Sequence, residues 1–229
     1  MNKHDYNLQT LYNEDAITYY LLGAFVTDGC VYVRKNRPNS LVVTLTSKDK
    51  DWLETINQYI CPNKPLLKHG LNCYRLMYMS SDMGNWLISH GCGARKSLIL
   101  QFPDIPIKYL GDFIRGCWDG DGSLSHTKSA NKGRNWQRQA NLTSGSKEFC
   151  QSMSDHLTSL EVKNKITPHG NHERKIDGRV LQPSMSWRVV VSNGNSTYNL
   201  CKSIYEDCII SMPRKQKIAE SIIAEWESE

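Results

Sequence analysis

The sequence predicts an α+β fold made of two pseudo-symmetric αββαββα repeats, each with a four-stranded antiparallel sheet. Four short sequence blocks recur in the same order in the two halves of the chain. In each half, segments with helical spacing alternate with pairs of short runs rich in β-branched residues. The composition, with 39% hydrophobic and 22% charged residues, is typical of a globular chain rather than of a low-complexity one.

The internal repeat is clearest in two glycine-containing segments. Leu21–Gly29 (LLGAFVTDG) aligns with Ile114–Gly122 (IRGCWDGDG) at a separation of 93 residues. Three further blocks align at separations of 97, 113 and 119 residues, and they start at Leu45 and Leu142, Tyr74 and Trp187, and Arg95 and Arg214. The growing separations indicate one unit with longer loops in its second copy. We therefore divide the chain into an N-terminal repeat, residues 1–105, and a C-terminal repeat, residues 106–229.

Each repeat is expected to run helix, hairpin, helix, second pair of strands, helix. The first helix is apolar on nearly every side, which suits a buried helix, and it ends at a glycine that we expect to take a positive φ. The segments predicted for the N-terminal repeat are Ile17–Asp28, Cys30–Arg34, Ser40–Thr46, Asp51–Ile60, Leu66–His69, Cys73–Met79 and Met83–Ser89, with Asn36–Asn39 as the hairpin turn. Those predicted for the C-terminal repeat are Tyr109–Asp121, Ser123–Lys128, Trp136–Thr143, Lys147–Leu160, Lys163–His169, Ser186–Ser192 and Thr197–Ile209.

Several classes of protein are excluded by composition. No apolar run approaches the roughly 20 residues of a membrane span, and the N-terminus lacks a secretory apolar segment. The eight cysteines form no CxxC pair, so we expect reduced thiols and no structural zinc site. We expect a soluble monomer with no membrane partner, inside the cell in the cytoplasm or nucleoid, or in an organelle if it is encoded there.

The charge pattern favours a polyanion as partner. The net charge is +5, and basic residues gather after each glycine-containing segment, whereas acidic residues gather at the C-terminus. A four-stranded sheet with helices on one face leaves its other face open. The strands of both repeats mix β-formers with Arg, Lys, Asn, Gln, Ser and Thr, which can contact phosphates and base edges in a major groove.

The two glycine-containing helices also predict a metal site. If they pack about a pseudo-twofold axis, Gly23 and Gly116 let their backbones approach closely, and Asp28 and Asp121 then meet at one point below the two sheets. Two neighbouring carboxylates repel unless a cation lies between them, and oxygen ligands suit Mg²⁺. The sequence therefore favours a metal-dependent phosphodiesterase site.

At these residues the chain resembles the LAGLIDADG homing endonucleases in their monomeric, two-motif form. The resemblance covers nearly the whole chain and includes Phe113–Gly122 and the segment Gly91–Ser97, GCGARKS. It implies two LAGLIDADG helices that pack the repeats together and two sheets that form a DNA-binding saddle. The implied activity is cleavage of both strands of a long, asymmetric DNA site across the minor groove, leaving short 3′ overhangs.

The resemblance also implies roles for individual residues. Asp28 and Asp121 match the acids that bind divalent metal, Mg²⁺ with Mn²⁺ or Ca²⁺ able to substitute in binding, and the carbonyls of Thr27 and Gly120 occupy positions that complete the coordination. Lys96 and Lys215 match basic residues near the start of each repeat's last helix that face the scissile phosphates. Ser47 and Ser144 fall where the family has a polar residue that orders water. Asp119 occupies the other acidic position of the motif, which the family does not usually employ as a metal ligand, and Val26 replaces that acid in the first copy.

Fourteen basic residues are candidates for contacts with double-stranded DNA. They lie in or near the expected strands and loops: Arg34, Lys35, Arg37, Lys48, Lys68, Arg75, Lys128, Lys132, Arg134, Arg138, Lys165, Arg174, Arg179 and Arg188.

Two other functions remain open on the same scaffold. One is an intron RNA maturase, which would make intron RNA a second partner, and the other is a DNA-binding regulator that does not cut. Retention of both motif acids favours the endonuclease over either alternative.

Overall fold

The structure is a computed structural model that describes residues 5–34, 37–93, 96–128, 136–170, 174–176, 179–181 and 185–228. The side chains of residues 38, 39, 136, 174–176 and 179–181 lie outside this description. The first repeat contains η1 (Leu8–Leu11), α1 (Ala16–Asp28), β1 (Gly29–Arg34), β2 (Arg37–Ser47), α2 (Lys50–Ile60), β3 (Leu67–Lys68), β4 (Tyr74–Met79), α3 (Ser81–Ser89) and η2 (Lys96–Leu98). The second contains η3 (Ile107–Tyr109), α4 (Leu110–Asp121), β5 (Gly122–Lys128), β6 (Trp136–Ser144), α5 (Lys147–Ser159), β7 (Lys165–His169), β8 (Arg174–Ile176), β9 (Arg179–Leu181), β10 (Ser186–Val191), α6 (Gly194–Tyr205) and α7 (Pro213–Ser228).

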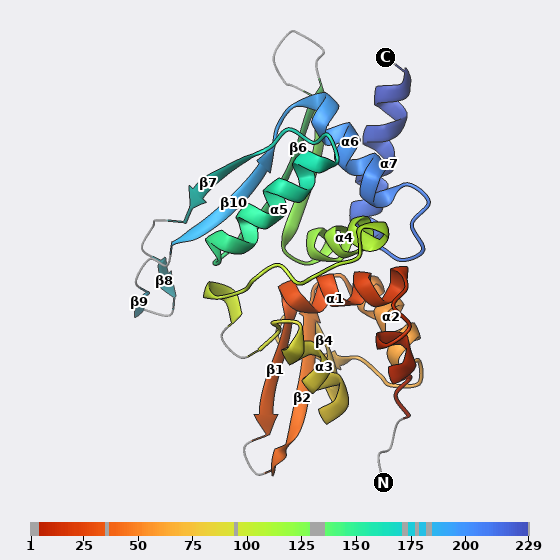
Figure 1. The fold of residues 1–229 in the computed structure, drawn as a ribbon. Coiled ribbons are helices and arrows are strands. Elements are labelled where there is room, and N and C mark those ends of the chain that lie inside the picture. The colour runs from red at the N-terminus through yellow and green to blue at the C-terminus, as the bar shows by residue number, and fades with distance from the viewer. Residues whose placement is uncertain are drawn as a thin grey trace.

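The predicted α+β architecture is confirmed. The two main sheets are antiparallel and have the same topology, with strand orders β1-β2-β4-β3 and β5-β6-β10-β7. Figure 1 shows α1 and α4 side by side at the centre of the molecule, with one sheet extending from each. The division between residues 105 and 106 remains a prediction from the sequence.

Three details differ from the sequence prediction. The helix expected over Thr197–Ile209 ends at Tyr205, and a separate helix, α7, follows after the turns and bends of residues 206–212. A two-stranded hairpin, β8–β9, stands apart from the four-stranded sheets. Residues expected in the first hairpin turn belong to β2, which begins at Arg37 because Arg37 pairs with Arg34 across an irregularity in the ladder.

Local side-chain chemistry defines where several helices start. Asp15 accepts a hydrogen bond from the backbone N–H of Thr18, and Thr18 bonds back to the N–H of Asp15, which forms a capping box before α1. Ser80, Ser146 and Asn193 accept from the third residue of α3, α5 and α6 in the same way. None of the helices among the described residues combines the length and the apolar character needed to cross a bilayer.

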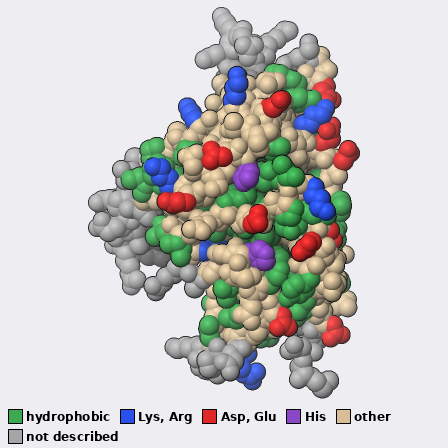
Figure 2. All heavy atoms as spheres, viewed as in Figure 1, with side chains coloured by type: hydrophobic (Ala, Val, Ile, Leu, Met, Phe, Trp, Pro, Cys, Tyr) green, Lys and Arg blue, Asp and Glu red, His purple; other side chains and the backbone are tan. Residues whose placement is uncertain are grey.

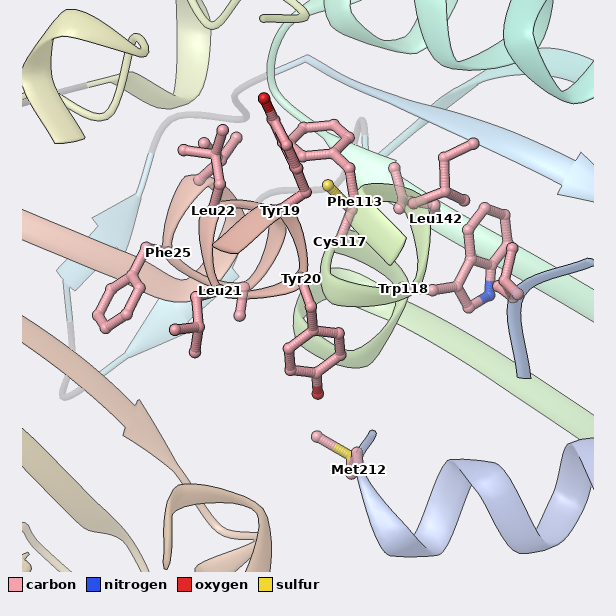
Figure 3. Close-up of a cluster of buried hydrophobic side chains, with 14 of the residues drawn as sticks. Tyr19, Tyr20, Leu21, Leu22, Phe25, Phe113, Cys117, Trp118, Leu142 and Met212 are labelled. Carbon is pink, nitrogen blue, oxygen red and sulfur yellow. The ribbon is translucent and has the colours of Figure 1, made fainter. Parts of the chain in front are cut away.

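A single hydrophobic core runs through both repeats. The residues at its centre come from the two glycine-containing helices and include Leu21, Phe25, Phe113 and Cys117, all fully buried (Figure 3). Helices α2 and α3 cover one face of the first sheet, and α5 and α6 cover the corresponding face of the second. Among the residues that the structure describes, no helix covers the other face of either main sheet.

Gly23 and Gly116 allow α1 and α4 to touch backbone to backbone. A Cβ atom at Gly23 would lie 2.2 Å from the carbonyl oxygen of Phe113, and one at Gly116 would lie 2.1 Å from that of Tyr20. These distances are shorter than any real carbon–oxygen contact, and the obstacle is backbone, which cannot rotate away. Any side chain at either position would therefore separate the two helices.

We expect Gly116→Ala to destabilise the protein by about 3 kcal/mol or more, because the added methyl group overpacks a rigid helix contact. Urea unfolding followed by circular dichroism measures the change. Gly93→Ala is the control, since no atom of the described residues lies within 4 Å of a Cβ built at Gly93. Equal effects of the two substitutions would contradict the assigned role of the helix contact.

Candidate active site at the ends of α1 and α4

The C-terminal ends of α1 and α4 meet at a pair of aspartates. A Cβ atom at Gly120 would lie 2.1 Å from Oγ1 of Thr27 and 3.6 Å from Cγ of Asp28, so the last turns of the two helices are in contact. Asp28 and Asp121 each end their helix, and their carboxyl groups lie close enough to hydrogen-bond with each other. The structure thus brings together the two acids that are 93 residues apart in the sequence.

The glycine after each aspartate lets the backbone pass close to a carbonyl oxygen of the preceding helix, and it does not adopt an unusual backbone conformation. Gly29 has φ −76° and Gly122 has φ −87°, so the expected positive φ was wrong for both. The chain passes directly from helix into strand at these residues. A Cβ at Gly29 would lie 2.4 Å from the carbonyl oxygen of Phe25, and one at Gly122 would lie 2.5 Å from that of Trp118, which leaves room only for glycine.

Both carboxyl groups hold their protons more tightly than a free aspartate does. Burial raises the pKa of Asp28 to about 7, and the charge of Asp121 adds to the effect, whereas Lys215 and Lys96 oppose it. Burial also raises the pKa of Asp121, again against the two lysines. Two partly desolvated like charges in contact favour either a shared proton or a bound cation.

Lys96 and Lys215 lie at equivalent places beside this pair. The ammonium group of Lys96 donates to the carbonyl oxygen of Gly29, and that of Lys215 donates to the carbonyl oxygen of Gly122 at 2.6 Å. Lys215 also donates to the carbonyls of Trp118 at 2.6 Å and Asp119 at 2.7 Å, so it caps the C-terminal end of α4. Burial lowers the pKa of Lys215 to about 8. Lys215 lies in the first turn of α7, but Lys96 lies in a short 3-10 turn rather than in the expected α-helix.

The two candidate serines play matching local roles. Ser47 accepts a hydrogen bond from the backbone N–H of Asp49 at 3.1 Å, and Ser144 accepts one from that of Ser146 at 3.2 Å. Both therefore stabilise the turn from a strand into the next helix. Ser144 also lines a cavity of about 150 Å³ together with Thr27, Lys96 and Asp121, whereas Ser47 does not.

Asp119 performs a structural task that the sequence did not indicate. Its carboxylate is fully buried and accepts hydrogen bonds from the hydroxyls of Tyr20 at 2.8 Å and Tyr205 at 2.7 Å. It also accepts from the backbone N–H of Met212 at 2.7 Å, directly before α7. Figure 3 shows Tyr20 reaching from α1 toward Met212. Since α7 carries Lys215, this carboxylate fixes the helix that supplies a lysine to the site.

The candidate DNA-contacting residues divide between the two faces of the sheets. Side chains alternate along a strand, and the register places Arg34 and Arg75 on the open face of the first sheet and Lys165 and Arg188 on that of the second. Arg138 lies on the opposite face, 8% exposed, with its guanidinium 5.1 Å from the ring centre of Trp226 in α7.

The structure does not place the remaining candidates on the open face of a sheet. Lys128 shares the helix-side register of Leu124, Lys68 lies opposite Tyr74 at the exposed sheet edge, and Lys48 and Arg37 are exposed. Lys35, Lys132 and Arg134 lie outside the described residues, and for Arg174 and Arg179 only the backbone is described. On the face drawn in Figure 2, acidic and basic side chains are interspersed, so charge alone does not mark that face as a polyanion surface.

An arginine held by a threonine and a histidine occurs once on each open face. Arg75 donates to Oγ1 of Thr46 at 3.1 Å and contacts Nε2 of His69 at 2.6 Å. Arg188 makes the same pair of contacts with Thr143, at 3.4 Å, and His169. The sequence alignment had matched Arg75 with Arg188, but the shared partners become visible only in the structure. Both guanidinium groups are thereby fixed at the end of the sheet nearest Asp28 and Asp121.

Comparisons with known proteins identify the family and agree with the fold. The family model described as LAGLIDADG-like domain matches residues 15–60 and 108–205. A search of the curated proteins finds no sequence match.

Solved structures with the same fold include three meganucleases. I-SmaMI bound to uncleaveable DNA has a TM-score of 0.59 at 13% identity, covering 92% of this chain and 90% of its own. I-AabMI bound to uncleaved DNA has a TM-score of 0.58 at 15% identity, with coverages of 92% and 91%. The LAGLIDADG homing endonuclease I-LtrWI bound to target DNA has a TM-score of 0.55 at 12% identity, with coverages of 95% and 92%.

We expect Tyr205→Phe to destabilise the protein by about 2 kcal/mol, because it removes a donor from a buried carboxylate. Tyr198→Phe is the matched control on the same helix, since the hydroxyl of Tyr198 bonds to Glu227 in an exposed setting and its loss should cost less than about 0.5 kcal/mol. Thermal and urea unfolding measure both. A smaller loss for Tyr205→Phe than for the control would contradict the buried network.

The aspartate pair predicts that the metal-free protein loses stability as pH rises. The pKa of Asp28 is raised from 3.8 to about 7, so the folded protein keeps a proton that the unfolded chain releases, and this advantage is lost between about pH 4 and pH 7. At pH 8 with a chelator, Asp28→Asn should therefore be more stable than the wild type by on the order of 1 kcal/mol, reduced by partial solvent exposure.

The difference should become small at about pH 3, where the wild-type carboxyl group is mostly protonated in both the folded and the unfolded state. Urea unfolding at both pH values tests this. Asp82→Asn, which changes an exposed residue in the first turn of α3, should have no comparable effect. A destabilising Asp28→Asn at pH 8 would contradict the repulsion between the two groups.

Proposed function

Because the chain belongs to the LAGLIDADG-like domain family, we propose that it is a site-specific homing endonuclease. It hydrolyses one phosphodiester in each strand of a long, asymmetric double-stranded DNA target, depends on a divalent metal, and leaves short 3′ overhangs. The observation that carries this proposal is the meeting of Asp28 and Asp121 at the ends of two symmetric helices, flanked by Lys96 and Lys215. The protein acts inside the cell, where its DNA target lies.

The residues of the site fit a hard divalent cation such as Mg²⁺. Among the described residues no cluster of three or more His, Cys, Asp or Glu side chains could hold a metal. Beyond the two carboxylates, the backbone carbonyls of Thr27 and Gly120 and oxygens of the DNA would supply the remaining ligands. All of these are oxygen ligands, which Mg²⁺ prefers, and a cation would also offset the burial and the neighbouring charge of Asp121 that raise the pKa of Asp28. When bound, the cation activates water and stabilises the leaving oxygen.

The chain's own residues prepare the site in three ways. Asp28 and Asp121 provide negative charge at a point on the pseudo-twofold axis, so that one cluster serves two strands. Lys96 and Lys215 lower the pKa of Asp28, which keeps more of the ligand pair ionised near neutral pH. The two open sheet faces extend from this point in opposite directions, since β1 and β5 begin at the residues that follow the two aspartates (Figure 1).

The pair formed by Asp28 and Asp121 also helps to decide between the endonuclease and the two alternatives, an RNA maturase and a DNA-binding regulator that does not cut. A maturase or a regulator on this scaffold has no need of two desolvated carboxylates in contact, which cost stability. Their presence on both helices favours cleavage.

Sequencing of the ends produced from a randomised double-stranded DNA library tests this function. With Mg²⁺ we expect paired breaks with short 3′ overhangs at one long motif and none with a chelator. Asp28→Asn and Asp121→Asn should each reduce double-strand cleavage by about a thousandfold or more, because each removes a charged ligand. Asp82→Asn should cut normally.

Binding measured in Ca²⁺ separates recognition from chemistry. The two aspartate variants should still bind the selected site, which shows that they fold. Specific DNA binding by the wild type without any cleavage would favour the regulator, and binding of structured RNA alone would favour the maturase.

A further inference from the structure

The open faces of the two sheets differ sharply in chemistry although their backbones match. At equivalent positions the first sheet carries Tyr32, which is 41% exposed, and Val42, which is buried at 3% exposed, where the second carries Ser125 and Gln139. The two sheets share strand order, and the pairing of Tyr32 with Val42 matches that of Ser125 with Gln139, so at these positions the difference lies in the side chains.

The first sheet presents an apolar surface to solvent. Tyr32 is 41% exposed, and Met79 and Leu67 are each 40% exposed, all on the side without helices. Met77 lies between them on β4. Exposed apolar side chains gathered on one sheet face are unusual unless something covers them.

The second sheet presents hydrogen-bonding groups instead. Gln137, Gln139 and Asn141 point from alternate positions of β6 to the open face, beside Ser123 and Ser125 of β5. Gln137 and Gln139 are exposed, and neither side chain bonds to the part of the chain that the structure describes. Their amide groups are thus available to a ligand.

The spacing of these side chains suits DNA. Alternate residues of a strand are about 6.7 Å apart, which is close to the rise of two base pairs. In the major groove, glutamine and asparagine pair with N6 and N7 of adenine, whereas apolar groups contact the methyl group of thymine. Arg75 and Arg188, held in the same way by threonine and histidine, lie at the inner end of each sheet, and arginine is the side chain that most often contacts guanine in the major groove.

We propose that the two repeats read their half-sites by different chemistry: the N-terminal repeat by apolar contact with thymine methyl groups, and the C-terminal repeat by amide hydrogen bonds to adenine. Arginine contacts with guanine are common to both halves and lie at equal distances from the point of cleavage. This inference rests on the proposed function, since it requires DNA on the open faces. It assigns Tyr32, Met79, Gln137 and Gln139 as specificity-determining residues.

Two base analogues distinguish these chemistries. Deoxyuridine lacks the methyl group of thymine, and 7-deazaadenine lacks the N7 acceptor of adenine. Each is placed singly along the selected target, and the affinity of the wild-type protein is measured in Ca²⁺. Deoxyuridine should weaken binding about tenfold at one or more positions of the N-terminal half-site and have little effect in the other half. The 7-deazaadenine substitutions should show the reverse pattern.

Substitutions show which half-site each repeat reads, and they test the individual side chains assigned to base contacts. Arg188→Ala should relax base preference in one half only, which identifies the half-site of the C-terminal repeat. Gln139→Val should abolish sensitivity to 7-deazaadenine at one position, and Met79→Ser should abolish sensitivity to deoxyuridine at one position. Both replace exposed side chains on the open face, so the fold should tolerate them.

The outcomes separate this inference from the function on which it rests. If the protein binds and cuts the target but both half-sites are equally sensitive to each analogue, the two repeats do not read DNA by different chemistry. The proposed endonuclease function is then unaffected. Failure of the wild type to bind any DNA overturns both.

Discussion

The backbone contact between α1 and α4 is the constraint on which the rest of the structure depends. Gly23 and Gly116 each place their Cα against the partner helix, so the two helices lie closer than any pair with side chains at the crossing could. This closeness brings the last residues of both helices, Asp28 and Asp121, into contact. It also fixes the origin of both sheets, because β1 and β5 continue directly from the helix ends. Sheet spacing and carboxylate spacing are thus set by one packing contact.

The site that results is electrostatically unfavourable without a cation. Burial raises the pKa of both aspartates, the charge of Asp121 adds to the effect on Asp28, and two lysines only partly offset this. The lysines in turn donate their hydrogen bonds at the helix ends, Lys215 to the carbonyl groups of Trp118 and Asp119 in the last turn of α4, and Lys96 to that of Gly29, directly after α1. The aspartate pair costs stability, and the two lysines that bond at the ends of α1 and α4 compensate for part of that cost.

The two repeats are symmetric at the aspartate pair, but the buried residues of α1 and α4 that pack against the rest of each repeat differ. Asp119 and Arg115 of α4 are buried and hold the segment between α6 and α7, with Arg115 donating to the carbonyl oxygens of Ile204 and Ile210 at 2.8 Å each. The equivalent residues of α1, Leu22 and Val26, are apolar and fully buried in the core. The second repeat thereby gains a positioned α7 and the lysine on it, whereas the first supplies its lysine from a short turn.

The sequence by itself determined the repeated unit of helices and paired strands and the pair of motif aspartates, because these depend on local periodicity and on a pattern that occurs twice. It missed α7 and the β8–β9 hairpin, which have no counterpart in the first repeat. It could not determine the role of Asp119, whose partners Tyr20 and Tyr205 are 99 and 86 residues away. It misjudged Gly29, since a terminal glycine signals positive φ and close approach equally well, and only the neighbouring Phe25 carbonyl decides between them. It also could not place Arg138 beneath Trp226, because the face of a strand depends on register, which tertiary packing fixes.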